Sequence, residues 1–229
     1  LGVSAQTRNF DDVEITPHKI TDNLYMLEGA GGNIGIFFGE DGALMIDDQF
    51  APLSEKITAA IAEITSEKIR FLINTHVHDD HVGGNEHFAD MGAVVVAHDN
   101  VRHRMSEGII NLRTGGQDSP APKVALPVIT LGDEISFHLN DERINIVSFG
   151  PAHTDGDIFV HFTESNVMHM GDVFRTTTFP IIDTGNGGNF HGIIAGLNKA
   201  IERADDNTKI IPGHGVITDK AMVQQVVAM

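Results

Sequence analysis

Three histidines and two aspartates lie within the six positions from His76 to His81, in the stretch "NTHVHDDHVGGN" (74–85). Their spacing on one tight loop directs imidazoles and the carboxylate of Asp80 toward two neighbouring points. These are the ligands that zinc takes where thiolates are absent, and the chain has no cysteine. Without a cation the clustered groups would repel or desolvate one another. The pattern therefore predicts metal binding. His76 and His78 can serve one point, and Asp80 and His81 can serve the other.

Each pair still lacks the third protein ligand that a catalytic zinc usually has. Candidates follow three later strand-like segments, each beside glycine or proline: His153 in "GPAHTDGD", Asp172 in "MHMGDVF" and His214 in "IPGHG". Sites in α/β sheets lie beyond the carboxyl ends of strands, so we expect all three at one edge of the fold. The total is seven ligands, the number that a bridged pair of metals needs. The remaining histidines lie in predicted helices or strands and are assigned to packing or to the surface: His18, His87, His98, His103, His138, His161, His169 and His191.

Hydrophobic periodicity predicts short strands separated by turns, with helices between them. The expected strands are 24–29, 33–39, 43–47, 69–74, 93–97, 128–131, 135–139, 143–149, 157–162, 166–170 and 209–212, and the expected helices are 52–67, 85–91, 98–107, 189–204 and a short one from 219. Each half of the chain is a run of strands followed by a helix and a strand. We therefore predict an α/β fold, a four-layer αββα sandwich of two mixed β-sheets. It forms a single domain over 1–229, with 1–19 as a lead-in and the polar connection 113–123 as a candidate mobile flap.

Composition and charge narrow the partners. Lys and Arg number 15 against 32 Asp and Glu, which gives a formal net charge of −17. Such a field repels phosphate backbones, so nucleic acid is not expected to bind. No apolar run approaches the ~20 residues of a membrane span, so membrane insertion is not expected either. The expected partner is a small-molecule substrate. The first residues, "LGVSA" (1–5), read like the end of a signal peptide and predict a periplasmic or secreted protein, with the cytoplasm as the alternative.

In this order, "THVHDDHVGGN", "HTDGD", "GD" and "GHG" resemble the metallo-β-lactamase-fold superfamily of hydrolases, from about Ile20 to the final helix. The αββα sandwich that the resemblance implies agrees with the strand pattern. It also implies two zinc ions, or another divalent metal such as iron or manganese. The ligands implied for the first metal are His76, His78 and His153. Those implied for the second are Asp80, His81 and His214, with Asp172 bridging both.

The resemblance implies that a hydroxide shared between the metals attacks a small carbonyl compound, with Asp80 as the catalytic residue that orients it. We expect a cyclic amide or ester, that is, a β-lactam or a lactone. True metallo-β-lactamases generally have Cys or Ser in place of Asp172, whereas an aspartate resembles the thioesterase, lactonase and phosphodiesterase branches. Glyoxalase II types carry a helical glutathione-binding extension where only fifteen residues follow His214 here, so a glutathione thioester is not expected. Alternatives from other classes are a mononuclear iron oxygenase similar to persulfide dioxygenases and a metal-dependent binding module.

Other residues are candidates for supporting the metals or touching the substrate because of their places in the chain. Asp47 and Asp48 end a predicted strand, and we expect them to accept hydrogen bonds from the 76–81 loop. Arg175 is the cation that follows Asp172 most closely. The predicted substrate contacts are Phe50, Phe174, Arg175, Phe179 and Ile181.

Overall fold

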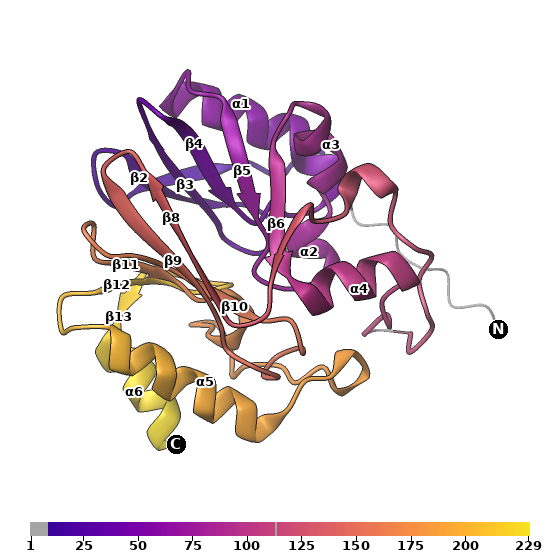
Figure 1. Cartoon of the computed structure of the whole chain (residues 1–229), viewed down its shortest axis with the longest axis vertical. Coiled ribbons are helices and arrows are strands. Elements are labelled where there is room, and N and C mark those ends of the chain that lie inside the picture. Colours follow the sequence, from indigo (N-terminus) through magenta and orange to yellow (C-terminus); the bar gives the residue numbers. More distant parts are fainter. Residues whose placement is uncertain (1–8, 113) are drawn as a thin grey trace.

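The computed structural model describes residues 9–112 and 114–229. Two β-sheets lie face to face, and helices cover the outer face of each (Figure 1). The predicted αββα sandwich of two mixed sheets is therefore confirmed. Among the described residues, no helix combines the length and the apolar character needed to cross a membrane. The export prediction rests on residues 1–5, which lie outside the described residues.

The first sheet has seven strands in sequence order. They are β1 (Thr16–Lys19), β2 (Leu24–Glu28), β3 (Ile34–Gly39), β4 (Gly42–Ile46), β5 (Ile69–Ile73), β6 (Val94–His98) and β7 (Ile129–Leu131). β1 to β4 pair antiparallel, and β4 to β7 pair parallel. We expected 1–19 to be a lead-in, but Thr16–Lys19 is an edge strand. Pro17 interrupts the strand pattern in the sequence, yet an edge strand tolerates a proline because one side of it has no partner.

The second sheet has six strands in the order β13-β12-β11-β10-β9-β8. They are β8 (Glu134–Leu139), β9 (Glu142–Ser148), β10 (Ile158–Phe162), β11 (Val167–His169), β12 (Lys209–Ile211) and β13 (Thr218–Asp219). The pairs are antiparallel except for β11 with β12, which run parallel. The parallel pair brings the carboxyl ends of β11 and β12 to the same edge of the sheet.

The helices fall into two sets, one for each sheet (Figure 1). The set beside the first sheet is α1 (Ser54–Ile64), α2 (Asp79–Val82), α3 (Asn85–Asp90) and α4 (Asp99–Glu107), and the set beside the second is α5 (Phe190–Arg203) and α6 (Lys220–Ala228). Short 3-10 turns occur at Ala51–Leu53, Lys123–Ala125, Gly171–Val173 and Thr184–Asn186. α1 ends three residues earlier than the predicted 67, because Thr65 is already extended (φ −150°, ψ 148°).

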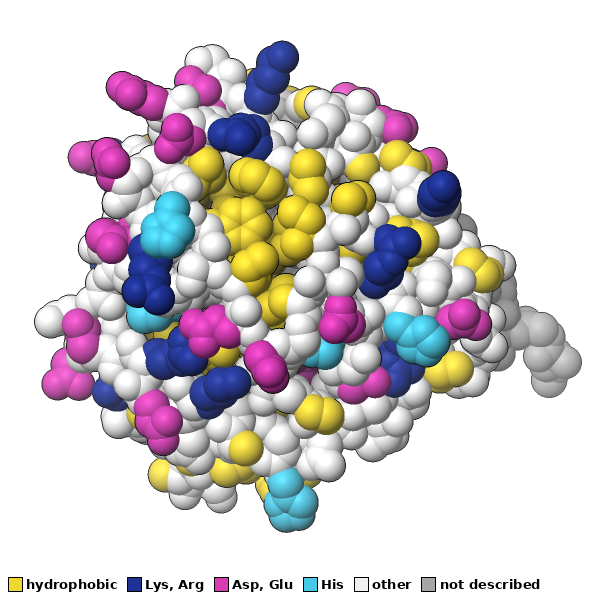
Figure 2. Space-filling model, viewed as in Figure 1, with side chains coloured by type: hydrophobic (Ala, Val, Ile, Leu, Met, Phe, Trp, Pro, Cys, Tyr) yellow, Lys and Arg dark blue, Asp and Glu magenta, His cyan; other side chains and the backbone are white. Residues whose placement is uncertain are grey.

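The largest hydrophobic cluster of the described residues lies between the two sheets, where β-branched and aromatic side chains from both inner faces interdigitate. Phe37 of β3 meets Phe162 of β10 across this layer, with ring centroids 5.2 Å apart. β7 and β8 are edge strands, and partly buried apolar side chains continue the core toward them, such as Phe71 and Phe137. Figure 2 shows apolar side chains at the opening between the sheets on this face, surrounded by scattered acidic and basic groups.

Candidate metal centre

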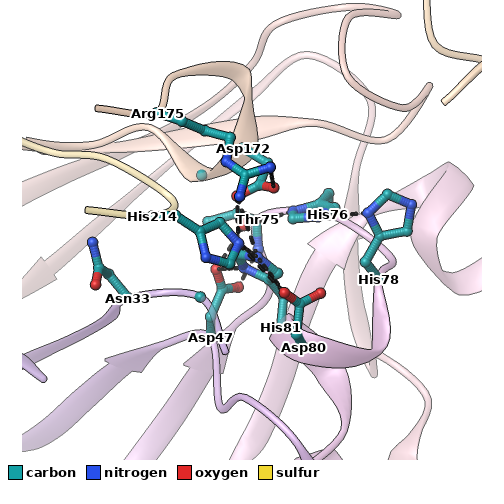
Figure 3. A network of polar contacts seen from close by, with 12 residues as sticks. Asn33, Asp47, Thr75, His76, His78, Asp80, His81, Asp172, Arg175 and His214 are labelled. Carbon is teal, nitrogen blue, oxygen red and sulfur yellow. Dashed lines mark hydrogen bonds and ion pairs between the residues drawn. The ribbon is translucent and has the colours of Figure 1, made fainter. Parts of the chain in front are cut away.

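The seven predicted ligands come together at one edge of the sandwich, on the loops that follow β5, β9, β11 and β12. Their nitrogen and oxygen atoms form three overlapping groups, and within each group all atoms lie within 4.8 Å of one another. The groups are His76 with His78 and His153, His76 with His81 and Asp172, and Asp80 with His81 and His214. Figure 3 labels these side chains, apart from His153, around their common centre.

In the first group, hydrogen bonds behind two rings decide which nitrogen faces the centre. The Nε2–H of His78 donates to Asp183 Oδ2 at 2.7 Å, and the Nδ1–H of His153 donates to the carbonyl oxygen of Ile181 at 2.7 Å. Both partners can only accept, so the opposite nitrogen of each ring keeps its lone pair. Those nitrogens, His78 Nδ1 and His153 Nε2, lie 2.9 Å apart, and His76 Nε2 is 3.2 Å from His78 Nδ1. Three lone pairs therefore face one point.

A single buried carboxylate, Asp47, orients the other two rings of the loop. Its Oδ1 accepts the backbone N–H of Thr75, and its Oδ2 accepts both the Thr75 hydroxyl and the Nδ1–H of His81, each at 2.7 Å. Because the Thr75 hydroxyl donates to Asp47, its oxygen accepts from His76 Nδ1, 3.1 Å away. The Nε2 atoms of His76 and His81 are thus left facing the centre. Asp47 holds the 76–81 loop as we expected.

Asp48 supports the same segment from the other side. Its Oδ1 accepts the backbone N–H of Gly84 at 2.8 Å, just beyond the loop. Its Oδ2 is buried and has no hydrogen-bond partner within the described residues. Burial, and to a smaller extent the neighbouring Asp47, raises the pKa of Asp48 well above its ordinary value. The carboxyl group therefore fixes the chain where the loop turns into α3 and does not reach an imidazole.

Asp172, a member of the second group, lies close to ligands of the first and third groups. Its Oδ1 lies 3.3 Å from His81 Nε2 and 3.3 Å from His214 Nε2, and its Oδ2 lies 3.9 Å from His153 Nε2. Oδ1 is buried, with no hydrogen-bond partner among residues 9–112 and 114–229. Asp80 Oδ2 completes the third group, 3.3 Å from His214 Nε2 and 4.0 Å from His81 Nε2. The position of Asp172 suits a ligand shared between two cations.

Burial and mutual charge shift the pKa values of this cluster strongly. Burial, helped by the neighbouring imidazoles, lowers the pKa of His76 well below its usual value, and burial lowers that of His153 to about 4. Burial alone would raise the pKa of Asp172, but His81 and His214 hold it well below normal. Burial alone would lower the pKa of His81, but Asp47 and Asp172 raise it well above normal. Two neutral imidazoles and an ionised carboxylate are what a metal requires of its ligands.

The residues present fit divalent cations. Lone pairs at His78 Nδ1, His76 Nε2 and His153 Nε2, 2.9–3.2 Å apart, repel one another unless a positive charge lies between them. Two nitrogens on one tetrahedral zinc are separated by roughly 3.3 Å, given zinc–nitrogen bonds of about 2.0–2.1 Å. A donor set of imidazole nitrogen and carboxylate oxygen suits zinc, iron or manganese. The orphaned Oδ1 of Asp172 supports the same conclusion, because a buried ionised oxygen needs a partner.

Three supporting residues were not predicted: Thr75, Asp183 and Asn33. Asn33 Nδ2–H groups donate to the carbonyl oxygens of Pro212 and Gly215, both at 2.9 Å, and so hold the loop that carries His214 (Figure 3). Asn33 lies 179 positions before Pro212 in the chain. Thr75 could have been suspected, because it directly precedes His76. Asn33 and Asp183 had no such signal.

A cavity of about 420 Å³ opens over the ligands. Among the described residues, its wall includes Asp79 and Asp80, the apolar side chains of Ile109, Ile110, Leu112 and Ile181, and Arg175. Arg175 Nη1 lies 3.6 Å from Asp172 Oδ2. Two of the predicted substrate contacts, Arg175 and Ile181, therefore line the cavity.

The other three predicted substrate contacts do not. Phe50 and Phe174 are buried in the hydrophobic clusters behind the first and second sheets. Phe50 packs against Phe10, with ring centroids 5.2 Å apart and the rings tilted by 45°, and Phe174 is fully buried among side chains of α5. Phe179 is 65% exposed and lies outside the cavity wall. Their proximity to ligands in sequence was misleading, because neighbouring positions on a loop point to opposite sides and large apolar groups turn inward.

Asp157 closes the loop that carries His153, and it gives a prediction for pH. Its carboxyl accepts the backbone N–H of Thr154 at 2.8 Å and the Thr154 hydroxyl at 2.7 Å, yet burial raises its pKa to about 8. A raised pKa stabilises the fold below about pH 4, and that contribution is lost as the pH rises through 8. In urea unfolding of metal-free protein from pH 4 to 8, the Asp157→Asn variant should lose less stability than the wild type. Parallel curves would show that Asp157 is ionised in the folded state.

His191 tests the assignment of the remaining histidines. It is exposed near the start of α5, with its ring beside Phe190 at 5.8 Å. His191→Ala should change kcat/KM of the metal-loaded protein by less than about threefold, because exposed substitutions away from a site have small effects. A loss beyond about a hundredfold in the same assay would place His191 in the site.

Known proteins resemble the chain in sequence and in fold. A family model described as "Metallo-beta-lactamase superfamily" matches residues 27–214. Hydroxyacylglutathione hydrolases from Polaromonas sp. strain JS666 and Nostoc punctiforme are each 28% identical, over 177 and 165 residues, or 76% and 70% of this chain. The chain spans 58% and 56% of the length of those relatives. A metallo-beta-lactamase structure from Pontibacter korlensis is 17% identical, covers 94% of this chain and 98% of its own, and superposes with a TM-score of 0.75, a likeness of fold.

Proposed function

Because the chain belongs to the metallo-β-lactamase superfamily, we propose that it is a hydrolase that uses two divalent cations, zinc in the first instance, to cleave a small carbonyl substrate. The substrate proposed is a cyclic amide or a cyclic ester. One observation carries the proposal: the nitrogen and oxygen atoms of seven candidate ligands converge beneath a cavity of about 420 Å³. A cavity of this size suits a small molecule.

The ligand groups assign each residue a place. His76, His78 and His153 would hold one cation, and Asp80, His81 and His214 the other, with Asp172 between them. Bound divalent cations supply activation of water near neutral pH and polarisation of a carbonyl oxygen. The chain's own contribution is to fix these ligands through Asp47, Asp183 and Asn33 so that little reorganises during the reaction.

Asp80 and Arg175 are the residues proposed to act on the reactants. Burial alone would raise the pKa of Asp80, but His81 and His214 hold it far below normal, so the carboxylate stays ionised at the cavity wall. It can accept a hydrogen bond from the attacking water and so orient it. Arg175 is the one Lys or Arg side chain among the described residues of that wall, and its guanidinium can hold a carboxylate of the substrate. Ile109, Ile110 and Leu112 give the cavity wall its apolar part.

Thioester hydrolysis is a second candidate, favoured by the names of the relatives from Polaromonas and Nostoc. It would use the same ligands, because a thioester also offers a carbonyl carbon to the attacking water. The wall favours a small substrate over glutathione: glutathione has two carboxylates, and the described wall offers one guanidinium for them.

A hydrolysis screen of the zinc-loaded protein tests the proposal, with panels of β-lactams, lactones, thioesters and phosphodiesters. Turnover of a cyclic amide or ester would support it. Arg175→Ala should then raise KM for the substrates that carry a carboxylate and leave KM for the others unchanged. Turnover of thioesters alone would favour the second candidate. Oxygen consumption with a sulfur substrate by the one-iron form would favour the oxygenase. Bound zinc without turnover of any substrate in the panels would favour the binding module. Export to the periplasm or beyond stays a prediction, which cell fractionation would check.

A further inference from the structure

A short hairpin forms the outer wall of the cavity. We define it as residues 108–112 and 114–118. Ile110 pairs with Gln117 across it, and its backbone is closed by Asn111 N–H to the Gly116 oxygen at 2.8 Å and Asp118 N–H to the Ile109 oxygen at 2.9 Å. Ile109, Ile110 and Leu112 of the hairpin face the cavity. The hairpin follows the end of α4, and Gln117 Nε2 ties it there by donating to the backbone oxygens of Glu107 and Gly108 at 3.0 and 3.2 Å.

Asn186 holds this hairpin in the way another strand would. Its Oδ1 accepts the backbone N–H of Ile110 at 3.0 Å, and its Nδ2 donates to the backbone oxygen of Ile110 at 2.7 Å. The side chain is fully buried. Arg104 steadies it from behind, with Nη1 3.3 Å from Asn186 Oδ1, while its Nε and Nη2 bind the carboxylate of Asp155 at 2.7 and 2.6 Å.

The second N–H of the same amide reaches the metal centre. Asn186 Nδ2 donates to Asp183 Oδ2 at 2.6 Å, and that oxygen also accepts the Nε2–H of His78 at 2.7 Å. Asp183 is held by its own turn, since its Oδ1 accepts the backbone N–H of Asn186 at 3.1 Å. A continuous chain of hydrogen bonds thus runs from the hairpin backbone through Asn186 and Asp183 to a ligand ring.

We propose that Asn186 is a positioning residue that couples the hairpin over the cavity to the metal ligand His78. A cation on His78 Nδ1 draws electron density from the ring and strengthens the Nε2–H donation to Asp183. Asp183 then holds Asn186 in place, and both contacts of Asn186 to Ile110 are kept. The coupling is reciprocal: metal orders the hairpin, and an ordered hairpin tightens metal binding. The inference rests on the metal centre of the proposed function. It adds that metal binding orders the hairpin in the cavity wall.

Amide hydrogen exchange tests the coupling without any substrate. Exchange is followed at Asn111 and Asp118, whose amides bond within the hairpin and not to Asn186, with and without saturating zinc. In the wild type, zinc should slow their exchange about tenfold, a typical coupling between linked sites. In Asn186→Ala the ratio should fall to near one, and the zinc affinity should fall about tenfold. Asn186→Asp should show the same loss of zinc response and of zinc affinity as Asn186→Ala, because it removes the N–H donors while keeping the size of the side chain.

Asn189→Ala is the matched control. Asn189 lies in the same turn region and caps α5 by accepting the Gly192 N–H at 3.1 Å, so the variant loses some stability without touching Asp183 or the hairpin. It should keep the zinc response of the wild type. A wild-type hairpin whose exchange ignores zinc would overturn the proposal even if no variant folds, and so would an Asn186→Ala or Asn186→Asp protein with the full response. Zinc-dependent protection without hydrolysis would overturn the proposed function and leave the coupling standing.

Discussion

Asp172→Ala should lower kcat/KM by about a thousandfold, equivalent to about 4 kcal/mol of transition-state stabilisation, and release most of the bound metal. Asp172 is the carboxylate that approaches the ligands proposed for both cations, with Oδ1 3.3 Å from His81 and His214 and Oδ2 3.9 Å from His153. The fold should persist, because its side chain belongs to no hydrophobic cluster. Elemental analysis, steady-state kinetics and circular dichroism together check the three parts of this expectation.

Asp79→Ala is the natural control for Asp172→Ala. Asp79 is an exposed carboxylate on the cavity wall, next to Asp80 in the chain, and it belongs to no ligand group. It should retain both metals and lose less than about tenfold in kcat/KM. Two zincs and full activity in Asp172→Ala would remove Asp172 from the site.

Removing the metal with a chelator should abolish hydrolysis and lower the melting temperature by about 10 °C. A ligand present at a thousand times its Kd stabilises a fold by about 4 kcal/mol, and for a chain of this size each kcal/mol moves Tm by about 2–4 °C. Adding zinc back should restore both. The metal content at full activity then separates the chemical alternatives, because two zincs per chain support the hydrolase and one iron supports the oxygenase.

The control for chelation is the Asp172→Ala variant, treated in the same way. Its Tm should respond much less to chelator and to added zinc than that of the wild type, because it starts with less metal. Equal Tm shifts in the two proteins would mean that zinc stabilises the fold from somewhere other than this cluster.

The convergence of the seven candidate ligands could be predicted because two simple rules place them together. His76, His78, Asp80 and His81 are close in sequence, so a tight loop must bring them together. His153, Asp172 and His214 each follow a strand, and strand ends on one side of a sheet meet at one edge. Neither rule needs the register of the strands or the packing of the two sheets.

The supporting residues escaped because their contacts depend on that packing. Asp183 lies 105 positions from His78, and Asn33 lies 179 from Pro212. Aspartate and asparagine in a glycine-containing stretch are also ordinary turn residues, so their types carry no signal. The aromatic predictions failed for a related reason: Phe174 is two residues from Asp172, but the turn at Gly171–Val173 sends it into the core behind the sheet.

The loop of His76 hangs from the first sheet, whereas the loops of His153, Asp172 and His214 hang from the second. Bound cations would therefore cross-link the two sheets, which are otherwise held together by packed side chains. The two sheets would separate only after a cation had dissociated. The rate of unfolding, and not only the free energy of unfolding, would therefore follow the rate of metal loss. Metal-loaded protein should then remain folded after brief heating that unfolds the metal-free protein. Substitutions that weaken the packing between the sheets would change the unfolding rate of the metal-free protein and leave that of the metal-loaded protein unchanged.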